Sequence, residues 1–290
     1  MKAYLLSLNK EANIADQWDF GFLKDFLVDN NFDIENVSKL PKDERAIVII
    51  PARHHAGLEK NVNKELSNIN RVVLFLMGDE EADYNAGMIT HKNIEVWVQN
   101  PHLDKHDKFN RLGTGYPQHM QEILSAMPVP VKKANDVFFA GQITHQRREE
   151  LAKYLIEIKG VSMYDINLVE TEGFTQGLNF EEYYTNLAQA KIAPAPSGAV
   201  VLDSFRLFEA LECMSLVIAD TRTPDGEVHE YWDWLFSEIA PFIGTPNWSS
   251  LYNMIPEELN DYPRRLHKQT AWWIMWKRNF KLKVLRQLNV

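Results

Sequence analysis

The first hundred residues alternate between short apolar runs of strand length and segments in which apolar residues have helical spacing. Residues 18–28 and 58–66 have helical spacing, and the runs that predict strands are residues 3–8, 46–50, 72–77 and 94–98. Strands that alternate with helices predict a parallel α/β sheet with helices packed on its faces. Ligands bind such sheets beyond the carboxyl ends of the strands, so the residues that follow each strand are the candidates for a site.

Reactive side chains follow three of these predicted strands. The residues there are Asn9, Lys10, Asp16, Trp18 and Asp19 after the first strand, Arg53, His54 and His55 after the second, and Gly78, Asp79, Glu80 and Glu81 after the third. The carboxylates and histidines among them could act as a general base. We favour Asp79 or Glu80 as the base, with His54 next. The alternative for Asp79 and Glu80 is an acid cluster at a helix N-terminus. The alternative for the two histidines is a loop pair with no task, because neighbouring side chains diverge and do not form a metal site.

Residues 191–220 predict a strand, a loop, a helix and a second strand. The loop is marked by Pro194, Pro196 and Gly198, and Ser204, Arg206 and Glu209 lie on the first turns of the helix that follows. A carboxylate at that place can accept two hydrogen bonds from a vicinal diol, and a helix N-terminus favours phosphate. This combination suits a nucleotide. The alternative is an ordinary helix whose Arg206 and Glu209 form a solvated (i, i+3) pair.

A second turn from strand to helix follows residues 136–140. Gly141 comes directly after this strand, and Arg147 and Arg148 begin the helix predicted over residues 146–158. Backbone N–H groups and guanidinium groups at such a turn can meet a diphosphate. Neither the Rossmann nor the P-loop glycine fingerprint is present. Further along, residues 173–178 form a glycine-flanked loop that contains Gly173 and Phe174 and is placed where a base or sugar could bind.

The segment SFRLFEAL, followed by the strand LVIAD, resembles the nucleotide-sugar site of GT-B glycosyltransferases. The resemblance is to the exostosin-like group found in bacteriophages and bacteria, whose pattern is Ser-x-Arg-x-x-Glu-Ala. Met214 stands where that family usually has Gly, and Val217 where it usually has Pro. The stretch FFAGQITHQRREEL looks like the family's first loop in the C-terminal domain, and residues 76–117 look, more loosely, like its N-terminal half.

The resemblance implies a GT-B fold, in which two Rossmann-like α/β domains face a cleft and a C-terminal helix crosses back to the N-terminal domain. We expect an acceptor-side domain over residues 1–128, a nucleotide-sugar domain over residues 129–262 and the crossing helix over residues 263–290. The first boundary falls at MPVPV, because two closely spaced prolines disfavour a helix. The last segment has Trp273, Trp276, Phe280 and Val284 at spacings of three and four residues, which predicts an apolar helix face.

The activity implied is transfer of a hexose or pentose from a nucleotide-diphosphate sugar, with UDP as the expected nucleotide, to a hydroxyl of a glycan, protein or small molecule. Glu209 would bind the ribose hydroxyls, and the full set of donor-binding residues would be Gly141, His145, Arg147, Arg148, Gly173, Phe174, Ser204, Arg206 and Glu209. Which of Arg147 and Arg148 faces the diphosphate stays open. No metal cofactor is required, because arginine and helix N-terminal amides can stabilise the departing diphosphate. The family leans towards inversion at the sugar.

The distribution of charge along the sequence keeps a second class of sugar acceptor possible. Eight Lys or Arg and no Asp or Glu lie from Arg264 onward, so this segment carries +8 and the rest of the chain −17 within a total of −9. A basic segment can bind polyanions or pack across its own acidic body. The alternative acceptor is therefore DNA with 5-hydroxymethylated pyrimidines, as in phage DNA modification. A protein that binds sugar nucleotides or polyanions without turnover is the alternative from another class.

The sequence also bears on compartment and thiol chemistry. The single cysteine, Cys213, excludes an internal disulfide and lies at an apolar helix end, so we expect a buried inert thiol. The N-terminal apolar run is too short for a signal peptide, and no run approaches the length of a membrane span. We expect a cytoplasmic protein, in the host cytoplasm if a phage encodes it.

Overall fold

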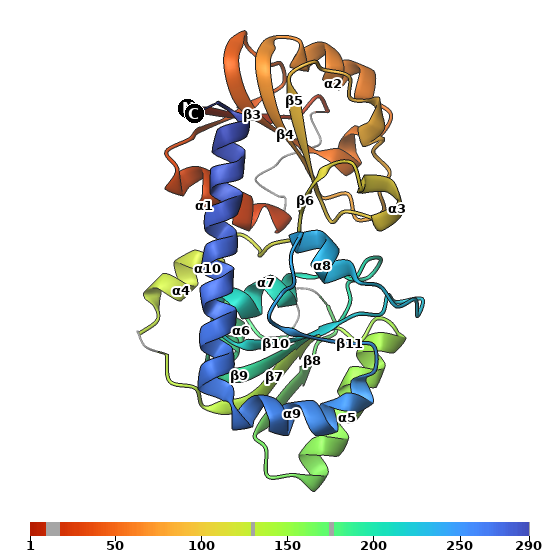
Figure 1. Ribbon diagram of the computed structural model, residues 1–290, viewed down its shortest axis with the longest axis vertical. Coiled ribbons are helices and arrows are strands. Elements are labelled where there is room, and N and C mark those ends of the chain that lie inside the picture. The colour runs from red at the N-terminus through yellow and green to blue at the C-terminus, as the bar shows by residue number, and fades with distance from the viewer. Residues whose placement is uncertain (10–17, 129–130, 174–176, 290) are drawn as a thin grey trace. The chain divides into compact units, whose positions relative to one another are not determined.

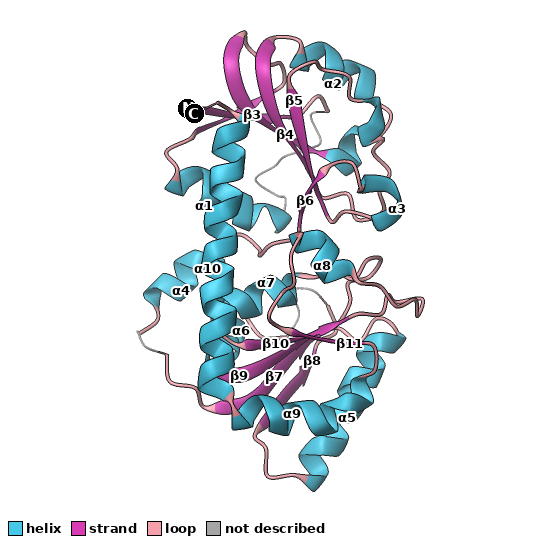
Figure 2. Ribbon diagram, in the orientation of Figure 1, coloured by secondary structure: helices cyan, strands magenta, loops and turns pink. Residues whose placement is uncertain are grey.

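The computed structural model describes residues 1–9, 18–128, 131–173 and 177–289, and it divides the chain into two compact units (Figure 1). The first unit comprises residues 1–118 and 276–290, and the second comprises residues 119–275. Each is an α/β unit built on one sheet of parallel strands (Figure 2). The division assigns α4 (Met120–Ala126) to the second unit, and it falls within the last helix, α10 (Tyr262–Gln287).

The first unit has a six-stranded sheet in the order β2-β1-β3-β4-β5-β6. Its strands are β1 (Lys2–Leu6), β2 (Asp33–Val37), β3 (Asp43–Pro51), β4 (Ile69–Met77), β5 (Ile94–Gln99) and β6 (Asn110–Leu112). Its helices are α1 (Gly21–Asp29), α2 (Glu59–Leu66), α3 (Leu103–His106) and the short 3₁₀ helices η2 (Trp18–Phe20), η3 (Ala52–His55) and η4 (Ala86–Met88). All of the strand pairs are parallel, as the alternation of strands and helices predicts.

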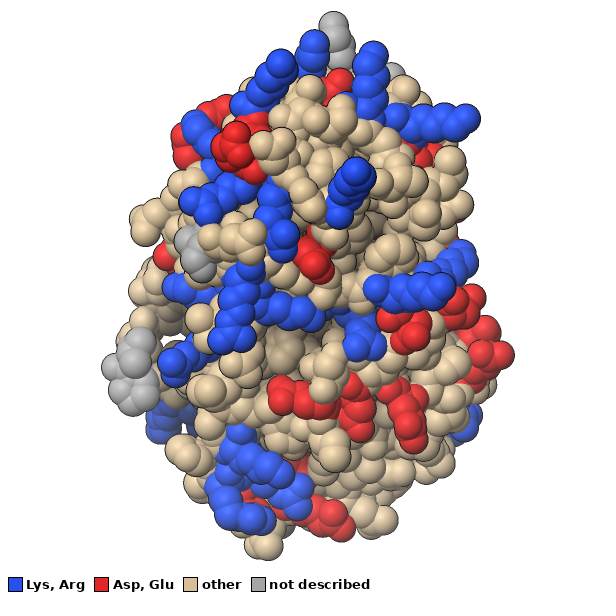
Figure 3. Space-filling view, turned by 45° about the horizontal axis from the view of Figure 1, so that its top comes forward, with Lys and Arg blue, Asp and Glu red and all other residues tan. Residues whose placement is uncertain are grey.

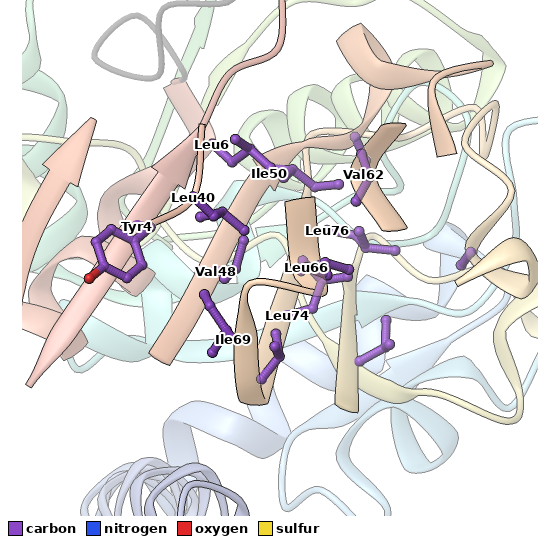
Figure 4. Packing of buried hydrophobic residues seen from close by; sticks show 14 of the residues in the cluster. Tyr4, Leu6, Leu40, Val48, Ile50, Val62, Leu66, Ile69, Leu74 and Leu76 are labelled. Atoms are coloured by element: carbon purple, nitrogen blue, oxygen red, sulfur yellow. The ribbon is translucent and has the colours of Figure 1, made fainter. Parts of the chain in front are cut away.

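Side chains alternate between the two faces of this sheet, and both faces are buried. On one face, Val48, Leu74 and their neighbours pack with Val62 and Leu66 of α2 (Figure 4). On the other face, the ring of Phe280 from α10 lies 5.0 Å from the Trp97 ring and 5.0 Å from the Phe26 ring of α1. A sheet with both faces covered is the arrangement that parallel strands require.

The second unit has a five-stranded parallel sheet in the order β11-β10-β9-β7-β8. Its strands are β7 (Asn135–Gly141), β8 (Ile166–Glu170), β9 (Ala190–Ala195), β10 (Leu216–Asp220) and β11 (Ile243–Thr245). Its helices, besides α4 and the start of α10, are α5 (Gln146–Val161), α6 (Phe180–Gln189), α7 (Phe205–Glu212), α8 (Tyr231–Phe236), α9 (Leu251–Asn260) and the 3₁₀ helix η5 (Trp248–Ser250). One face of the sheet packs on α5 and α9, with Val137, Leu155 and Ile255 among the buried residues.

The apolar face predicted for the C-terminal helix is buried. Trp273, Trp276, Phe280 and Val284 are all less than a tenth exposed. Cys213 is a free, buried thiol, as the sequence predicts. Within the described residues, no helix has the length and apolar character needed to cross a membrane.

The turn after α7 explains one departure from the exostosin-like pattern. Ser215 N–H donates to Ala210 C=O at 2.9 Å and Met214 N–H donates to Leu211 C=O at 3.3 Å, which is a Schellman motif. That motif needs a left-handed residue, and Met214 supplies it with φ of 51°. A glycine adopts this backbone without the steric cost that a Cβ brings, so Met214 holds a position at which glycine is the usual residue.

Candidate functional site

Each sheet reverses its direction of winding at one pair of neighbouring strands. In the second unit the chain runs from β7 outward to β8 and then returns to β9 on the other side of β7. In the first unit the same reversal separates β1 from β3. Open α/β sheets bind ligands beyond the carboxyl ends of the strands at such a switch point. The candidate site of the second unit therefore consists of residues 141–148 after β7 and residues 196–206 after β9.

Arg206 lies against the end of β7. Its Nε donates to the Ala140 carbonyl at 3.1 Å, and its guanidinium carbon is 5.3 Å from the centre of the Phe139 ring. The guanidinium occupies the space that a side chain at Gly141 would need, since a Cβ added at that residue would be 1.8 Å from Arg206 Nη2. Among the described residues, the two Nη atoms make no ion pair or hydrogen bond, so this half-buried guanidinium keeps donors for an anion.

His145 and Ser197 lie beside these groups and carry buried polar atoms without a partner. The Nδ1 atom of His145 and the Oγ atom of Ser197 are both buried and make no hydrogen bond in the described structure. Burial and the charges of Arg148, Arg147 and Arg206 together lower the pKa of His145 to about 4, while the hydrogen bond with the Ser197 carbonyl acts in the opposite direction. His145 is therefore a neutral imidazole in a positive environment. An anionic ligand would find there a favourable potential and two unused hydrogen-bonding atoms.

Two helix N-termini contribute to the same environment. The sixteen-residue α5 begins after His145 and the eight-residue α7 begins after Ser204, and neither helix is capped by the side chain of that residue. Ser204 Oγ donates instead to the Pro196 carbonyl at 3.0 Å. The dipole of each helix adds partial positive charge at its N-terminus.

Arg147 is committed to a buried ion pair. Its Nη2 and Nε donate to the two carboxylate oxygens of Asp220 at 2.8 and 3.2 Å, and the two side chains are 3% and 0% exposed. Arg147 also pairs with Glu150, donates to the Pro246 carbonyl at 3.3 Å and lies over the Trp248 ring. This arginine joins the start of α5 to the end of β10. A diphosphate could recruit it only at the expense of that pair.

Arg148 is buried as well, and its described contacts are with backbone oxygens. Nε and Nη2 donate to the Ser197 carbonyl at 3.3 and 3.2 Å, and Nη1 donates to the Gln142 carbonyl at 3.3 Å. The positive charge of Arg148 contributes to the lowered pKa of His145. Arg148 therefore joins the loops that follow β7 and β9 while it adds to the positive potential of the switch point.

Glu209 lies on α7 with its carboxylate buried. It accepts hydrogen bonds from the hydroxyls of Tyr183 at 2.7 Å and Tyr184 at 3.0 Å, both on α6. Burial raises the pKa of Glu209, whereas the two tyrosines and Arg206 lower it. The carboxylate that is predicted to bind the ribose hydroxyls therefore also has a structural role, since it joins α7 to α6. Of the remaining predicted residues, Gly173 is half-buried, and Phe174 falls outside the described part of the chain.

In the first unit, the two histidines that follow β3 differ sharply. His55 is fully buried, and its Nε2 accepts the Leu8 N–H at 3.0 Å while its Nδ1 lies 2.9 Å from the Pro51 carbonyl. Burial lowers its pKa, so it is a neutral structural residue that joins the ends of β1 and β3. His54 is exposed.

The two predicted bases after β4, Asp79 and Glu80, differ in their exposure to solvent. Both oxygens of the buried Asp79 accept backbone N–H groups at 2.9 Å, from Asp83 and from Tyr84. This carboxylate closes the turn of its own loop. Glu80 is exposed.

Sequence reasoning assigned no role to several residues on which these arrangements depend. The sequence predicts Asp220 only as the end of a strand, and it predicts no role for Ser197, Tyr183 or Tyr184. The one usable signal was position, because Asp220 ends a predicted strand and therefore lies at the carboxyl edge of the sheet. The sequence gives no such signal for Tyr183 and Tyr184, because an aromatic pair on an amphipathic helix usually indicates residues of the hydrophobic core.

Comparisons with known proteins give no family for the chain. No family of known proteins matches the sequence, and no curated protein matches it. Among solved structures, the chain is similar to a carbohydrate transporter from Acidothermus cellulolyticus in complex with myo-inositol. That match is 8% identical, covers 76% of this chain and 73% of the other, and has a TM-score of 0.24, which is too low to bear on fold or function.

Proposed function

We propose that the chain is a GT-B glycosyltransferase that moves a sugar from a nucleotide-diphosphate sugar, with UDP as the expected nucleotide, to a hydroxyl group. The observation that carries the proposal is the guanidinium edge of Arg206, which has no hydrogen-bond or ion-pair partner among the described residues and lies against Gly141 at the switch point of the second unit. Beside it are a neutral histidine, the guanidinium of Arg148 and the start of two helices. These groups suit a diphosphate, which is the part that all such donors share.

The proposed transfer requires one deprotonation and one bond cleavage. The acceptor oxygen must lose a proton as it bonds to the anomeric carbon, and the bond from that carbon to the diphosphate oxygen must break with its electron pair remaining on the diphosphate. Arg206 and the N–H groups of α5 and α7 would stabilise the negative charge that develops on the leaving group. A side chain of the first unit would receive the proton.

A second candidate is binding of a sugar nucleotide without turnover. It is favoured by one observation, that several predicted site residues already have structural partners. Arg147 is paired with Asp220, Glu209 with two tyrosines, and Asp79 with backbone amides. The same donor site serves both candidates, so they differ only in whether sugar is released.

The test is to incubate the purified chain with a panel of UDP- and GDP-sugars and measure free nucleoside diphosphate, because transferases commonly pass sugar to water. Binding of UDP and GDP is measured in parallel by calorimetry. We expect micromolar to millimolar binding together with slow donor hydrolysis that Arg206→Gln reduces tenfold or more. Arg278→Gln is the control, since Arg278 is exposed on α10. Binding without release of sugar supports the second candidate, and no binding of either nucleotide refutes both.

The DNA acceptor is tested in the same preparation. Basic and acidic side chains gather in separate groups on the face in Figure 3, so the net charge of −9 does not describe every part of the surface. Arg264 and Arg265, however, pair with Asp261 and Glu258 of their own chain. We therefore place a glycan, protein or small molecule first and keep DNA as the alternative acceptor, which no retention on DNA even at low salt would remove. Retention that collapses between low and physiological salt would reverse that order.

A further inference from the structure

A cavity of about 430 Å³ lies in the first unit between the C-terminal part of α10 and the first half of β4. It is lined by Arg71, Asn279, Leu282, Lys283, Arg286 and Gln287. Its volume falls within the range of small-molecule sites, which is roughly 300–1,000 Å³. Since Arg71 is near the start of β4, the cavity lies toward the amino ends of the strands, away from the residues that follow β3 and β4.

The helical residues of this cavity form one stripe along α10. Leu282, Lys283 and Arg286 stand three, four and seven residues after Asn279, which places all four on one side of the helix. Lys281 is two residues from both Asn279 and Lys283, so it lies on the opposite side. The basic residues of α10 therefore do not form a single continuous track.

Three of the lining residues are cations, and no Asp or Glu lines the cavity in the described part of the chain. Arg71 Nε donates to the Gln287 carbonyl. The two Nη atoms of Arg71, the Arg286 guanidinium and the Lys283 ammonium make no hydrogen bond or ion pair with any described residue. Positive charge and unused donors thus converge on this cavity from two elements.

Contacts with β5 hold one side of the cavity in place. Lys283 Nζ is 4.9 Å from the centre of the Trp97 ring, Trp97 Nε1 donates to Gln287 Oε1 at 2.8 Å, and Gln287 Nε2 donates to Glu95 Oε2 at 3.1 Å. Partial burial lowers the pKa of Lys283, and the charge of Arg111 lowers it by more than Glu95 raises it. The ammonium therefore lies in a positive environment that Glu95 does not offset.

We propose that this cavity binds the phosphate group of a small organic phosphate. Guanidinium forks and an ammonium are strong donors to phosphate, and a phosphate monoester carries up to about two negative charges at neutral pH. Asn279 and Leu282 offer an amide and an apolar surface to the rest of the ligand. All of these residues belong to the first unit, so the site is separate from the proposed donor site and does not depend on it.

A structural role for the same cations makes a different prediction. Lys283 and Arg286 lie near the C-terminal end of α10, where positive charge complements the helix dipole. That end carries only about half a negative charge, which three cations exceed several-fold. If the role were structural alone, Lys283→Gln and Arg286→Gln would lower stability, and phosphate would bind to none of the proteins.

The experiment titrates phenyl phosphate into the full chain by calorimetry at low and at physiological salt. Lys283→Gln and Arg286→Gln change exposed residues, and each should weaken binding about tenfold or more, because it removes a charged donor. Lys281→Gln is the control, since it removes an exposed charge from the other side of the same helix. It should bind within twofold of wild type. Arg206→Gln removes the phosphate contact proposed for the second unit, and binding at the cavity should persist in it.

Three results would overturn the inference. A wild-type chain that does not bind phenyl phosphate at low salt has no such site. Binding that Arg206→Gln abolishes while Lys283→Gln and Arg286→Gln retain it would assign the phosphate to the second unit. Equal weakening by Lys281→Gln and Lys283→Gln would show a diffuse effect of net charge, as expected of a surface that binds a nucleic-acid backbone.

Discussion

The guanidinium of Arg206 occupies the space in which a side chain at Gly141 would begin, since a Cβ there would lie 1.8 Å from Nη2. Gly141 does not need a left-handed backbone, so its small size is what matters. We predict that Gly141→Ala displaces the guanidinium and lowers UDP affinity about tenfold, while stability changes by less than about 1 kcal/mol because the far end of a flexible side chain gives way. Calorimetry and thermal unfolding measure the two effects.

Gly160→Ala is the matched control for that variant. Gly160 lies on α5 of the same unit, and an added Cβ would meet nothing within 4 Å. It should leave UDP affinity unchanged and stabilise the fold by up to about 1 kcal/mol, as a glycine replaced in a helix does. Equal affinity in Gly141→Ala and wild type would mean that Arg206 does not bind the diphosphate.

Arg147 should matter for stability more than for affinity. Arg147→Met leaves the fully buried Asp220 without its ion-pair partner, and breaking such a pair costs about 3–5 kcal/mol. The double variant Arg147→Met/Asp220→Asn should recover part of the loss in urea denaturation. Arg264→Met, which breaks an exposed pair with Asp261, should cost about 1 kcal/mol or less. Equal losses in the two single variants would contradict the assignment.

The raised pKa of Asp19 predicts that the free energy of unfolding depends on pH. Burial raises its pKa to about 6 in the folded chain from an ordinary value of 3.8, so the folded state binds more protons between these two values. Stability contributed by this group should therefore fall as pH rises from about 4 to 6, by roughly 3 kcal/mol at most, and stay level above. Urea denaturation of wild type and Asp19→Asn across this range measures the difference. Curves that stay parallel would show that Asp19 titrates normally.

At Met214 the sequence resemblance predicts the usual residue, and the structure gives the physical reason for it. The resemblance places a glycine at this turn, and the left-handed backbone at Met214 gives the physical reason. We predict that Met214→Gly stabilises the chain by about 0.5–1 kcal/mol, because it relieves the Cβ strain at some cost in unfolded-chain entropy. Met163→Gly, at a fully exposed loop residue with an ordinary backbone, should stabilise nothing. Thermal unfolding of both variants decides the point, and a destabilised Met214→Gly would contradict it.

Local pattern was enough for the parallel sheets and for the strand ends after which reactive residues lie, because hydrophobic period and turn residues act over a few positions. The local pattern could not show which of those residues are available to a ligand and which have structural partners. Arg147 and Arg206 look alike in sequence, yet one meets Asp220, 73 residues along the chain, and the other meets Gly141. Partners so distant in sequence depend on strand order. Asp79 differs, because its oxygens are occupied within its own loop, whereas the main chain of Asp19 is held by Gln99, 80 residues further along the chain.

Glu209 offers the sharpest test of the donor site, since its structural and ligand-binding tasks can be separated by the nucleotide used. If its carboxylate accepts the ribose hydroxyls, wild type should bind UDP about tenfold or more tightly than 2′,3′-dideoxy-UDP, because hydrogen bonds to a charged group contribute about 1.5–3 kcal/mol. Glu209→Gln should remove that preference.

The same substitution at Glu212, one turn further along the same helix segment, is the control for Glu209. Glu212 accepts the Trp273 Nε1–H at 2.9 Å, and Glu212→Gln should keep the preference for UDP. A purely structural Glu209, engaged only by Tyr183 and Tyr184, predicts a different pattern. Glu209→Gln would then lower stability and weaken both nucleotides equally, so that the ratio of their affinities matched that of wild type. Calorimetry with the two nucleotides on all three proteins distinguishes the outcomes.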